Sequence, residues 1–319
     1  MIEAFIDRFA FRRDGLIGAA LLRVALAGIM LVGYLWLWPV RSAVLGDMGQ
    51  MSNAQYLRLS MNEPYALYRY AHTSIATDAL LLVSIAIAVA FAIGFIPRVT
   101  SWLFVLTAYS TVNRGFLDGD GGRILLLLMA VLLCFADSSR YLTLFPGRSL
   151  RLAWLRVLGT MVHNSASFLI RWQVCAVYAW AVFYKLGGSQ WRGGTAMAYV
   201  FQTSHFAWFP SVSAALAHNA VLVALMTYGT LVFQGAFPFL MWNERIKPYL
   251  VAIACALHLT IAVTMGLLSF SATMIVCDLA VLSDVHFLKF FAFCRGLVLR
   301  VPLAAKPLNV IHSTEVTNH

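Results

Sequence analysis

Residues 16–38 read LIGAALLRVALAGIMLVGYLWLW, an apolar run that only Arg23 interrupts. A helix needs about 20 consecutive apolar residues to cross a bilayer. The rest of the chain has the same character, since 61% of its 319 residues are hydrophobic and only 11% are charged, whereas soluble domains carry about 25% charged residues. A soluble fold could not cover its surface with so few charges. The composition therefore predicts an all-α fold, a polytopic bundle of membrane helices.

The apolar runs and the residues that interrupt them predict about eight spans. These lie at residues 16–38, 77–96, 99–112, 122–137, 167–186, 217–241, 249–268 and 270–291. We expect an N-terminal segment (1–15), a transmembrane domain (16–292) and a C-terminal tail (293–319). The first run is too long for the core of a cleavable signal peptide.

The Lys and Arg residues predict the orientation of this bundle. Of the 23 Lys and Arg residues, 14 fall in the terminal segments and loops on one side, 6 in the loops on the other side and 3 within spans. Cytoplasmic loops carry the excess of these residues, so both termini are expected in the cytoplasm and the chain in the inner (plasma) membrane. Orientation also explains the net charge of +10 without a nucleic-acid partner.

Several polar residues are expected together at the outer face. Two long outer loops, 39–76 and 187–216, are rich in aromatic residues, which favour the membrane interface, and are predicted to form short interfacial helices. The chemistry-bearing residues that this orientation brings to the outer face are His72, Asn113, Arg114, Asp118, Asp120, Arg123, Lys185, Trp191, Arg192, His205 and His218.

Lys185, at the outer end of the fifth span, is the strongest candidate for a catalytic residue. An ionisable group within a bilayer is costly and is by default a functional hypothesis. Two interpretations are open. The side chain can extend to the interface, or it can lie in a mostly apolar pocket that destabilises its ammonium form and makes the amine a base or nucleophile. We take the second and expect His205 and His218 to assist.

Three further features have two readings each. Arg171, near the inner face, is either an interfacial anchor, which we favour, or a binding residue. His258, in the middle of the seventh span, is either a packing residue or a proton relay. The glycine-rich run from Asn113 to Arg123 is either a polar turn or a lid over a membrane pocket. No motif supports a metal or nucleotide site.

The fifth span carries a fairly specific pattern. It reads Arg171-Trp-Gln173, then Tyr178, Lys185-Leu186 and Trp191-Arg-Gly-Gly194, followed by Met197 and Tyr199. This pattern resembles the transmembrane region of vitamin K-dependent γ-glutamyl carboxylases and their bacterial relatives, the horizontally transferred transmembrane (HTTM) domain proteins. The resemblance covers residues 15–292 and is sharp only here. Weaker support comes from Asn113–Leu117, Phe233–Pro238 and His258.

The resemblance implies that Lys185 is the base that deprotonates a reduced quinone, as the corresponding lysine of the carboxylases does for reduced vitamin K. Its chemistry then faces the outside. Arg114 stands where the carboxylases tend to have histidine, Gln234 stands near a family glutamate, and the large luminal domain of the carboxylases has no counterpart. These departures argue against carboxylation of peptide glutamates. The chain is more similar to the bacterial members that include the membrane protein needed to mature the sporulation-delaying toxin.

The leading hypothesis is an inner-membrane enzyme that uses a reduced, vitamin K-like quinone to modify an exported peptide or small substrate at the outer face. The alternative is a non-enzymatic maturation, export or immunity partner of a secreted peptide toxin. A transporter is not favoured, because the sequence shows no inverted repeat. The residues expected to bind substrate or cofactor are His72, Asn113, Arg114, Asp118, Asp120, Arg123, Arg171, Gln173, Tyr178, Trp191, Arg192, Gln234 and His258.

Overall fold

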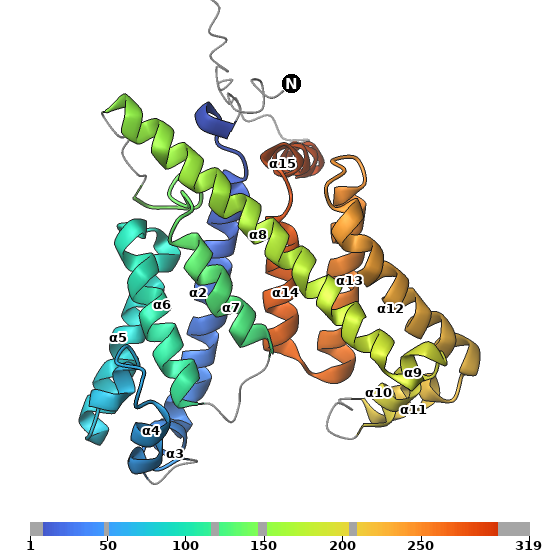
Figure 1. Ribbon diagram of the computed structural model, residues 1–319, viewed down its shortest axis with the longest axis horizontal. Coiled ribbons are helices and arrows are strands. Elements are labelled where there is room, and N and C mark those ends of the chain that lie inside the picture. Colours follow the sequence, from blue (N-terminus) through green and yellow to red (C-terminus); the bar gives the residue numbers. More distant parts are fainter. Residues whose placement is uncertain (1–8, 48–50, 116–120, 146–151, 204–208, 299–319) are drawn as a thin grey trace, which may run out of the picture. The chain divides into compact units, whose positions relative to one another are not determined.

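The computed structural model describes residues 9–47, 51–115, 121–145, 152–203 and 209–298, and within them all regular secondary structure is helical (Figure 1). The predicted all-α fold is therefore confirmed. The chain divides into two compact units, Met1–Asp284 and Val285–His319. The second contains most of one helix, and each unit is described by itself.

The helices differ widely in length. The longer ones are α2 (Leu16–Leu37), α5 (Ser74–Ile93), α6 (Pro97–Arg114), α7 (Gly121–Leu133), α8 (Ala153–Gly187), α12 (Ala220–Leu240), α13 (Lys247–Met265), α14 (Leu268–Ala280) and α15 (Asp284–Val298). The short ones are η1 (Trp38–Val40), α3 (Arg41–Leu45), α4 (Asn53–Leu59), η2 (Leu67–Tyr70), α9 (Ser189–Arg192), α10 (Ala196–Gln202) and α11 (Pro210–Ala217). The two predicted outer loops thus contain short helices, as expected.

Five helical segments among the described residues are long and apolar enough to cross a membrane. They are Leu16–Leu45, which joins α2 to α3, and helices α5, α8, α12 and α13. A sixth results if α14 and α15 form one broken span. Helices α6 and α7 lie where the third and fourth spans were predicted, but α7 has only 13 residues and α6 does not reach the required hydropathy. The count of eight spans and the side of the termini stay predictions.

The last predicted span, 270–291, is interrupted. Helix α14 ends at Ala280 and α15 begins at Asp284. The Asp284 carboxylate accepts hydrogen bonds from the backbone N–H groups of Gly15, Leu16 and Ile17 at 3.1, 3.1 and 2.8 Å. The first N–H groups of a helix have no partner within it, so Asp284 caps α2.

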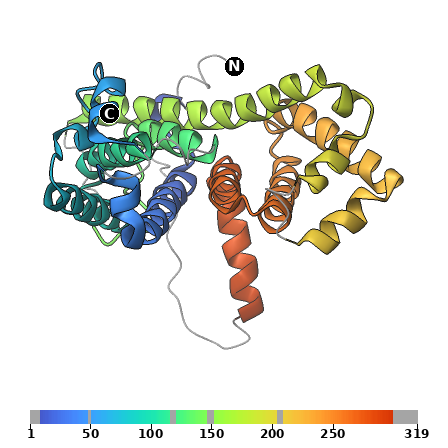
Figure 2. The same ribbon diagram turned by 90° about the horizontal axis from the view of Figure 1, so that it is seen from below.

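Helix α14 is central to the first unit. It packs against α2, α7, α8 and α13, while α5 packs against α2 and α6, and α12 packs against α8. Figure 2 shows α8 running along one side of the other helices, and it packs against α7, α12 and α14. Gly18 permits the close approach of α2 to α14, because a Cβ at this position would lie 2.7 Å from the Ala280 carbonyl oxygen.

Arg23, the charge within the first span, has a structural role. Its side chain is fully buried and donates to the carbonyls of Phe91 and Ala92 at 2.6 Å, and to that of Leu142 at 2.5 Å. Phe91 and Ala92 belong to the last turn of α5, whose carbonyls have no partner within the helix. Arg23 therefore joins α2 to the end of α5 and to the α7–α8 connection.

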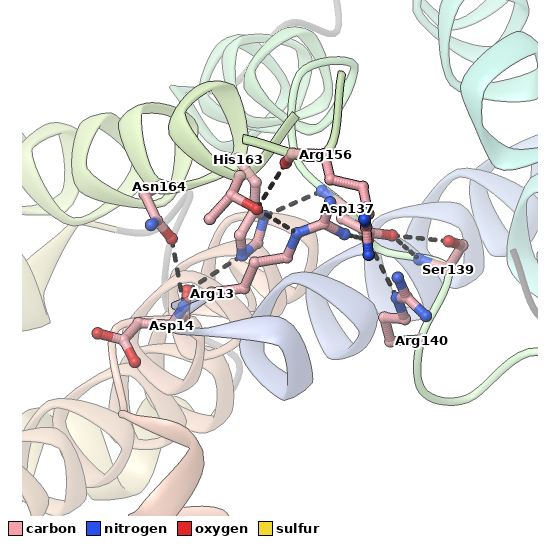
Figure 3. Close-up of polar contacts among 9 residues, drawn as sticks. Arg13, Asp14, Asp137, Ser139, Arg140, Arg156, His163 and Asn164 are labelled. Carbon is pink, nitrogen blue, oxygen red and sulfur yellow. Dashed lines mark hydrogen bonds and ion pairs between the residues drawn. The ribbon is translucent and has the colours of Figure 1, made fainter. Parts of the chain in front are cut away.

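Helix α8 begins 14 residues before the predicted span and has 35 residues, a length of about 52 Å. Its first turns take part in a polar cluster (Figure 3). His163 Nδ1 accepts the backbone N–H of Asp137 at 2.9 Å, and His163 Nε2 lies 3.1 Å from the carbonyl of Asp14. Asn164 donates to the carbonyls of Phe9 and Arg12 at 2.7 and 2.8 Å. These contacts attach the N-terminal segment and the α7–α8 connection to α8.

Asp137 is the charged centre of this cluster. It forms ion pairs with Arg13 and Arg140, and it accepts the Ser139 hydroxyl at 2.6 Å. Burial opposes its ionisation, but the Ser139 hydrogen bond and the two arginine charges outweigh burial and hold the pKa of Asp137 below its usual value. Most hydrogen bonds of the cluster involve a backbone group. The cluster therefore has a structural role: it holds the N-terminal segment and the α7–α8 connection against α8.

Candidate functional site

The residues of the candidate site come from one face of α8. Arg171, Tyr178 and Lys185 are spaced by seven residues, which is close to two turns, so their side chains share a face at steps of about 10 Å. Arg171 lies at one end, where its guanidinium is near Gly15 and Ser167. Tyr178 and Lys185 lie towards the other end, where α12, α13 and α14 supply their partners.

Tyr178 is the centre of a buried polar triad. Its hydroxyl lies 2.9 Å from Oδ2 and 3.1 Å from Oδ1 of Asp278, and 3.1 Å from Nε2 of His258. The three residues come from α8, α14 and α13, and none is more than 2% exposed. Buried polar groups are costly unless hydrogen-bonded, so the triad is a specific contact between three helices.

One assignment of the protons, with Asp278 ionised, satisfies the hydrogen bonds of this triad. The tyrosine hydroxyl has one proton, and the Asp278 carboxylate, 2.9 Å away, accepts it. The tyrosine oxygen then accepts a hydrogen bond from a protonated Nε2 of His258. Nδ1 of His258 is buried and has no hydrogen-bond partner among the described residues. In this arrangement Nδ1 has a free lone pair and is a proton acceptor.

Lys185 lies next to this triad along α8. Its ammonium donates to Oε1 of Gln234 at 2.9 Å and lies 5.2 Å from the centre of the Trp191 ring. No described carboxylate lies within ion-pair distance of Lys185. Gln234 is therefore level with Lys185. The reason is that α9, α10 and α11 precede α12, so α12 begins beyond the end of α8.

Helix α12 contributes both to the Lys185 contact and to the surroundings of Tyr178. Phe233 and Phe237, on either side of Gln234, pack against Tyr178 with ring centroids 5.9 and 4.1 Å away. The amide that binds Lys185 and the rings that enclose Tyr178 are thus set by the same two turns of helix. The run Phe233–Pro238, noted in the sequence, therefore positions both parts of the site.

Asn113 and Arg114, at the end of α6, take part in other contacts. Asn113 donates to Glu63 at 2.9 Å and to the Tyr109 hydroxyl at 3.1 Å. Arg114 is 2% exposed and donates to the carbonyls of Leu45, Gly46 and Met51 at 3.1, 3.0 and 2.9 Å. Arg114 thus fastens α3 and the segment before α4, a role that the binding prediction for this residue did not include.

The remaining predicted site residues are dispersed. His72, Arg192 and His218 are exposed, and His218 Nδ1 lies 2.6 Å from the Ala214 carbonyl of its own helix. Gln173 and Arg123 are half-buried. Asp118, Asp120 and His205 lie outside the described residues. The structure therefore gathers Tyr178, Lys185, Trp191, Gln234 and His258 from the predicted set.

Asp278 was missed by the sequence analysis. It lies within the predicted span 270–291, directly after Cys277. An acidic residue within a span is itself a signal of a functional or structural polar contact. The sequence itself therefore contained a signal for this residue.

A reduced quinone can be tested against the groups that surround Lys185. A hydroquinone has an acidic hydroxyl and an aromatic ring. The Lys185 amine can accept a proton, the Gln234 amide can donate to an oxygen, and the Trp191 ring can pack against another ring. The donor set therefore fits the group.

Comparison with known proteins gives limited guidance. No family model and no solved structure matches the chain. The chain is 30% identical over 198 residues to the protein YitO of Bacillus subtilis (strain 168), which is described as uncharacterized. The aligned part covers 60% of this chain and 62% of YitO, so the chain spans less than two thirds of that relative. This similarity assigns no activity to the chain.

Proposed function

We propose that this chain is an inner-membrane enzyme similar to HTTM domain proteins, which uses Lys185 as a base, together with a reduced quinone, to modify an exported peptide or small substrate. The observation that carries the proposal is the pairing of Lys185 with the neutral amide of Gln234 at 2.9 Å. A lysine that only anchors a helix end to the interface needs no such partner within the bundle.

The neutral partner bears directly on basicity. A carboxylate beside Lys185 would favour its ammonium form, and loss of the proton would then leave a buried, unpaired negative charge. With Gln234, loss of the proton leaves two neutral groups that can still form a hydrogen bond. Deprotonation of Lys185 therefore leaves no uncompensated charge on its partner.

The buried triad supplies a destination for a proton. Lys185 shares a face of α8 with Tyr178, whose hydroxyl lies 3.1 Å from His258 Nε2, and His258 Nδ1 is an acceptor without a partner among the described residues. A proton that arrives at His258 is stabilised by Asp278, whose Oδ2 lies 3.7 Å from His258 Nε2. Lys185 would accept a proton at Nζ, and His258 with Asp278 would balance the charge.

Lys185, Gln234 and Trp191 would hold a reduced quinone at this place. When bound, the quinone would supply an acidic hydroxyl and reducing equivalents. Lys185 would accept a proton at Nζ, Gln234 would orient the amine, and Trp191 would shield it from water.

The test uses cells of the host that carry the chain at its own locus. The variants are Lys185→Arg, which keeps the charge but cannot act as a base near neutral pH, and Gln234→Glu, which gives Lys185 a counter-ion. Lys289→Arg, at an exposed position of α15, is the matched control. The measurement is high-resolution mass spectrometry of peptides and small molecules in the culture medium, with immunoblots of membranes to compare protein levels.

We expect at least one product that wild type and Lys289→Arg release, and that both site variants reduce by about 10²-fold or more, the usual contribution of a general base. If Lys185→Arg releases the same products as wild type while deletion of the gene abolishes them, Lys185 is not a base. The non-enzymatic partner would then be the better account.

A further inference from the structure

Helix α15, most of which belongs to the second unit, exposes a large apolar surface. Leu288, Phe290, Phe291 and Phe293 are each more than half exposed, whereas Phe287 is buried. A contiguous group of exposed apolar side chains marks a surface that binds a protein or a membrane. The Lys185 site is built from α8, α12, α13 and α14, so what this surface binds goes beyond the proposed function.

The exposed face of α15 is an apolar stripe with a cation at each edge. Val285, Leu288 and Ala292 follow each other at intervals of three and four residues and are all exposed, the spacing of a single helix face. Lys289 lies four residues after Val285, a rotation of about 40° to one side, and Arg295 lies three residues after Ala292, about 60° to the other side. Both cations are exposed.

No carboxylate of α15 offsets these two cations along the stripe. Residues 285–298 contain no Asp or Glu. Asp284, the first residue of the helix, accepts hydrogen bonds from the N–H groups that begin α2. Lys and Arg beside an apolar stripe can lay their methylene stems on acyl chains while their charged ends reach headgroup phosphates. The stripe therefore matches the boundary between acyl chains and anionic headgroups.

The length of α15 favours a position along the membrane over a path across it. Its 15 residues rise by about 22 Å, less than the hydrocarbon core of about 30 Å. If α15 crossed the membrane, Lys289 would lie two residues from the midpoint of the helix and inside the core, where a charge is costly. A helix in the plane of the membrane keeps both cations at the level of the headgroups.

We propose that α15 binds in the plane of a membrane surface, with its apolar stripe among acyl chains and with Lys289 and Arg295 against anionic headgroups. The first unit supplies the reason for this partner. It contains five helical segments that are long and apolar enough to cross a bilayer, and α15 follows it directly in the chain. A lipid surface is thus within reach of α15, and its phosphates complement the two cations.

The test compares depth at two positions of the stripe in the full chain. Val285 or Ala292 is replaced by an environment-sensitive fluorescent amino acid, and the protein is placed in phosphatidylcholine nanodiscs with or without phosphatidylglycerol. Lipids with nitroxides at different carbons quench the fluorophore and report its depth. The two positions are seven residues apart, about 10 Å along the helix. The control pair is Ile75 and Leu82, which are exposed and equally spaced on α5, a helix able to cross a membrane.

We expect equal depth at 285 and 292, near the headgroups, and a difference of about 10 Å for the pair on α5. A similar difference between 285 and 292 would mean that α15 crosses the membrane, and it would overturn the proposal. An absence of quenching by lipid at both positions would also overturn it, because water, another protein or a second copy would then lie against the stripe.

A second measurement isolates the headgroup contact. Quenched and unquenched fluorescence lifetimes at position 292 give the ratio of membrane-bound to free α15. Lys289→Gln and Arg295→Gln should each lower this ratio about fivefold in anionic nanodiscs, the usual contribution of one basic residue near an anionic surface. Arg58→Gln, at an exposed position of α4, should leave the ratio unchanged. Equal ratios for wild type in neutral and anionic nanodiscs would overturn the contact with anionic headgroups.

Discussion

Replacement of Tyr178 by phenylalanine tests whether the buried triad holds α8, α13 and α14 together. The change removes one oxygen and keeps the ring between Phe233 and Phe237. It removes the hydroxyl that lies 2.9 Å from Asp278, a residue with no exposed surface. A hydrogen bond to a charged group contributes about 1.5–3 kcal/mol, and a buried group left unpaired adds to the loss. We expect Tyr178→Phe to lower the free energy of unfolding by about 2–4 kcal/mol.

The control is Tyr184→Phe, which makes the same change on the same helix at a side chain that is 74% exposed. It should change the free energy of unfolding by less than about 0.5 kcal/mol. Unfolding can be followed in mixed micelles with a thiol-reactive fluorophore, because Cys175 and Cys277 are buried free thiols beside the triad. Each becomes reactive when the helices separate.

A second background isolates the charge. In Asp278→Asn the amide oxygen still accepts the tyrosine proton, so the effect of Tyr178→Phe should fall to about 1 kcal/mol, that of a neutral hydrogen bond. The difference between the two backgrounds is the coupling of Tyr178 to the carboxylate. If Tyr178→Phe is no more destabilising than Tyr184→Phe, the triad is not a structural contact and our account of its energetics is refuted.

Two further predictions concern stability. Arg23→Met should lower the free energy of unfolding by about 3–5 kcal/mol, because it leaves buried carbonyls without their cationic partner. The control Arg58→Met, at an exposed position, should have little effect. Similar values for the two variants in the same thiol assay would contradict the role of Arg23. Asp137 has a pKa held below its usual value, so it stabilises the fold above its unfolded-state pKa, about 3.9, and this contribution is lost as the pH falls through the lower, folded-state pKa. The melting temperature of wild type should therefore fall more between pH 5 and pH 3 than that of Asp137→Asn, and equal falls would argue against the shift.

Several helices were predictable because local signals mark both of their ends. The run predicted at 77–96 is helix Ser74–Ile93. The Thr73 hydroxyl accepts the Ala76 N–H at 3.1 Å at its start, and Gly94, with φ of +75°, ends it. A Cβ at Gly94 would lie 2.2 Å from the Thr143 hydroxyl. Caps and apolar runs act within a few residues, so a single sequence shows them.

Two boundaries were missed because hydropathy is not the same property as helicity. Residues 153–166 contain the polar residues Arg156, His163 and Asn164, so hydropathy did not indicate the first turns of α8. Hydrogen bonds from His163 and Asn164 to the N-terminal segment stabilise these turns. The apolar character continues through Val281 and Leu282, so the break before α15 was hidden, although Ser and Asp residues commonly begin helices.

The site was predictable as a set of residues and not as an arrangement. Lys185, Gln234 and His258 are unusual for their spans and were identified one by one. Their contacts join residues 49 and 80 positions apart along the chain, and such distances depend on how helices pack. Asn113 and Arg114 were also identified one by one, but they are not part of the site. Asn113 forms a hydrogen bond with Glu63, and Arg114 forms hydrogen bonds with the backbone near α3.

The charges of the site constrain how it can work. Asp278 is the acidic member of the described group, and Lys185 and His258 are its two basic members. One carboxylate can balance only one cation in an apolar medium, where an unpaired charge is strongly unfavourable. His258 should therefore be neutral while Lys185 is charged, and a proton that leaves Lys185 for His258 preserves the balance with Asp278. Replacing Gln234 with glutamate would add a second carboxylate and allow both bases to be charged together. Under the proposed function, the amide of Gln234 would limit the site to one mobile proton, which suits a base that must return to its neutral form.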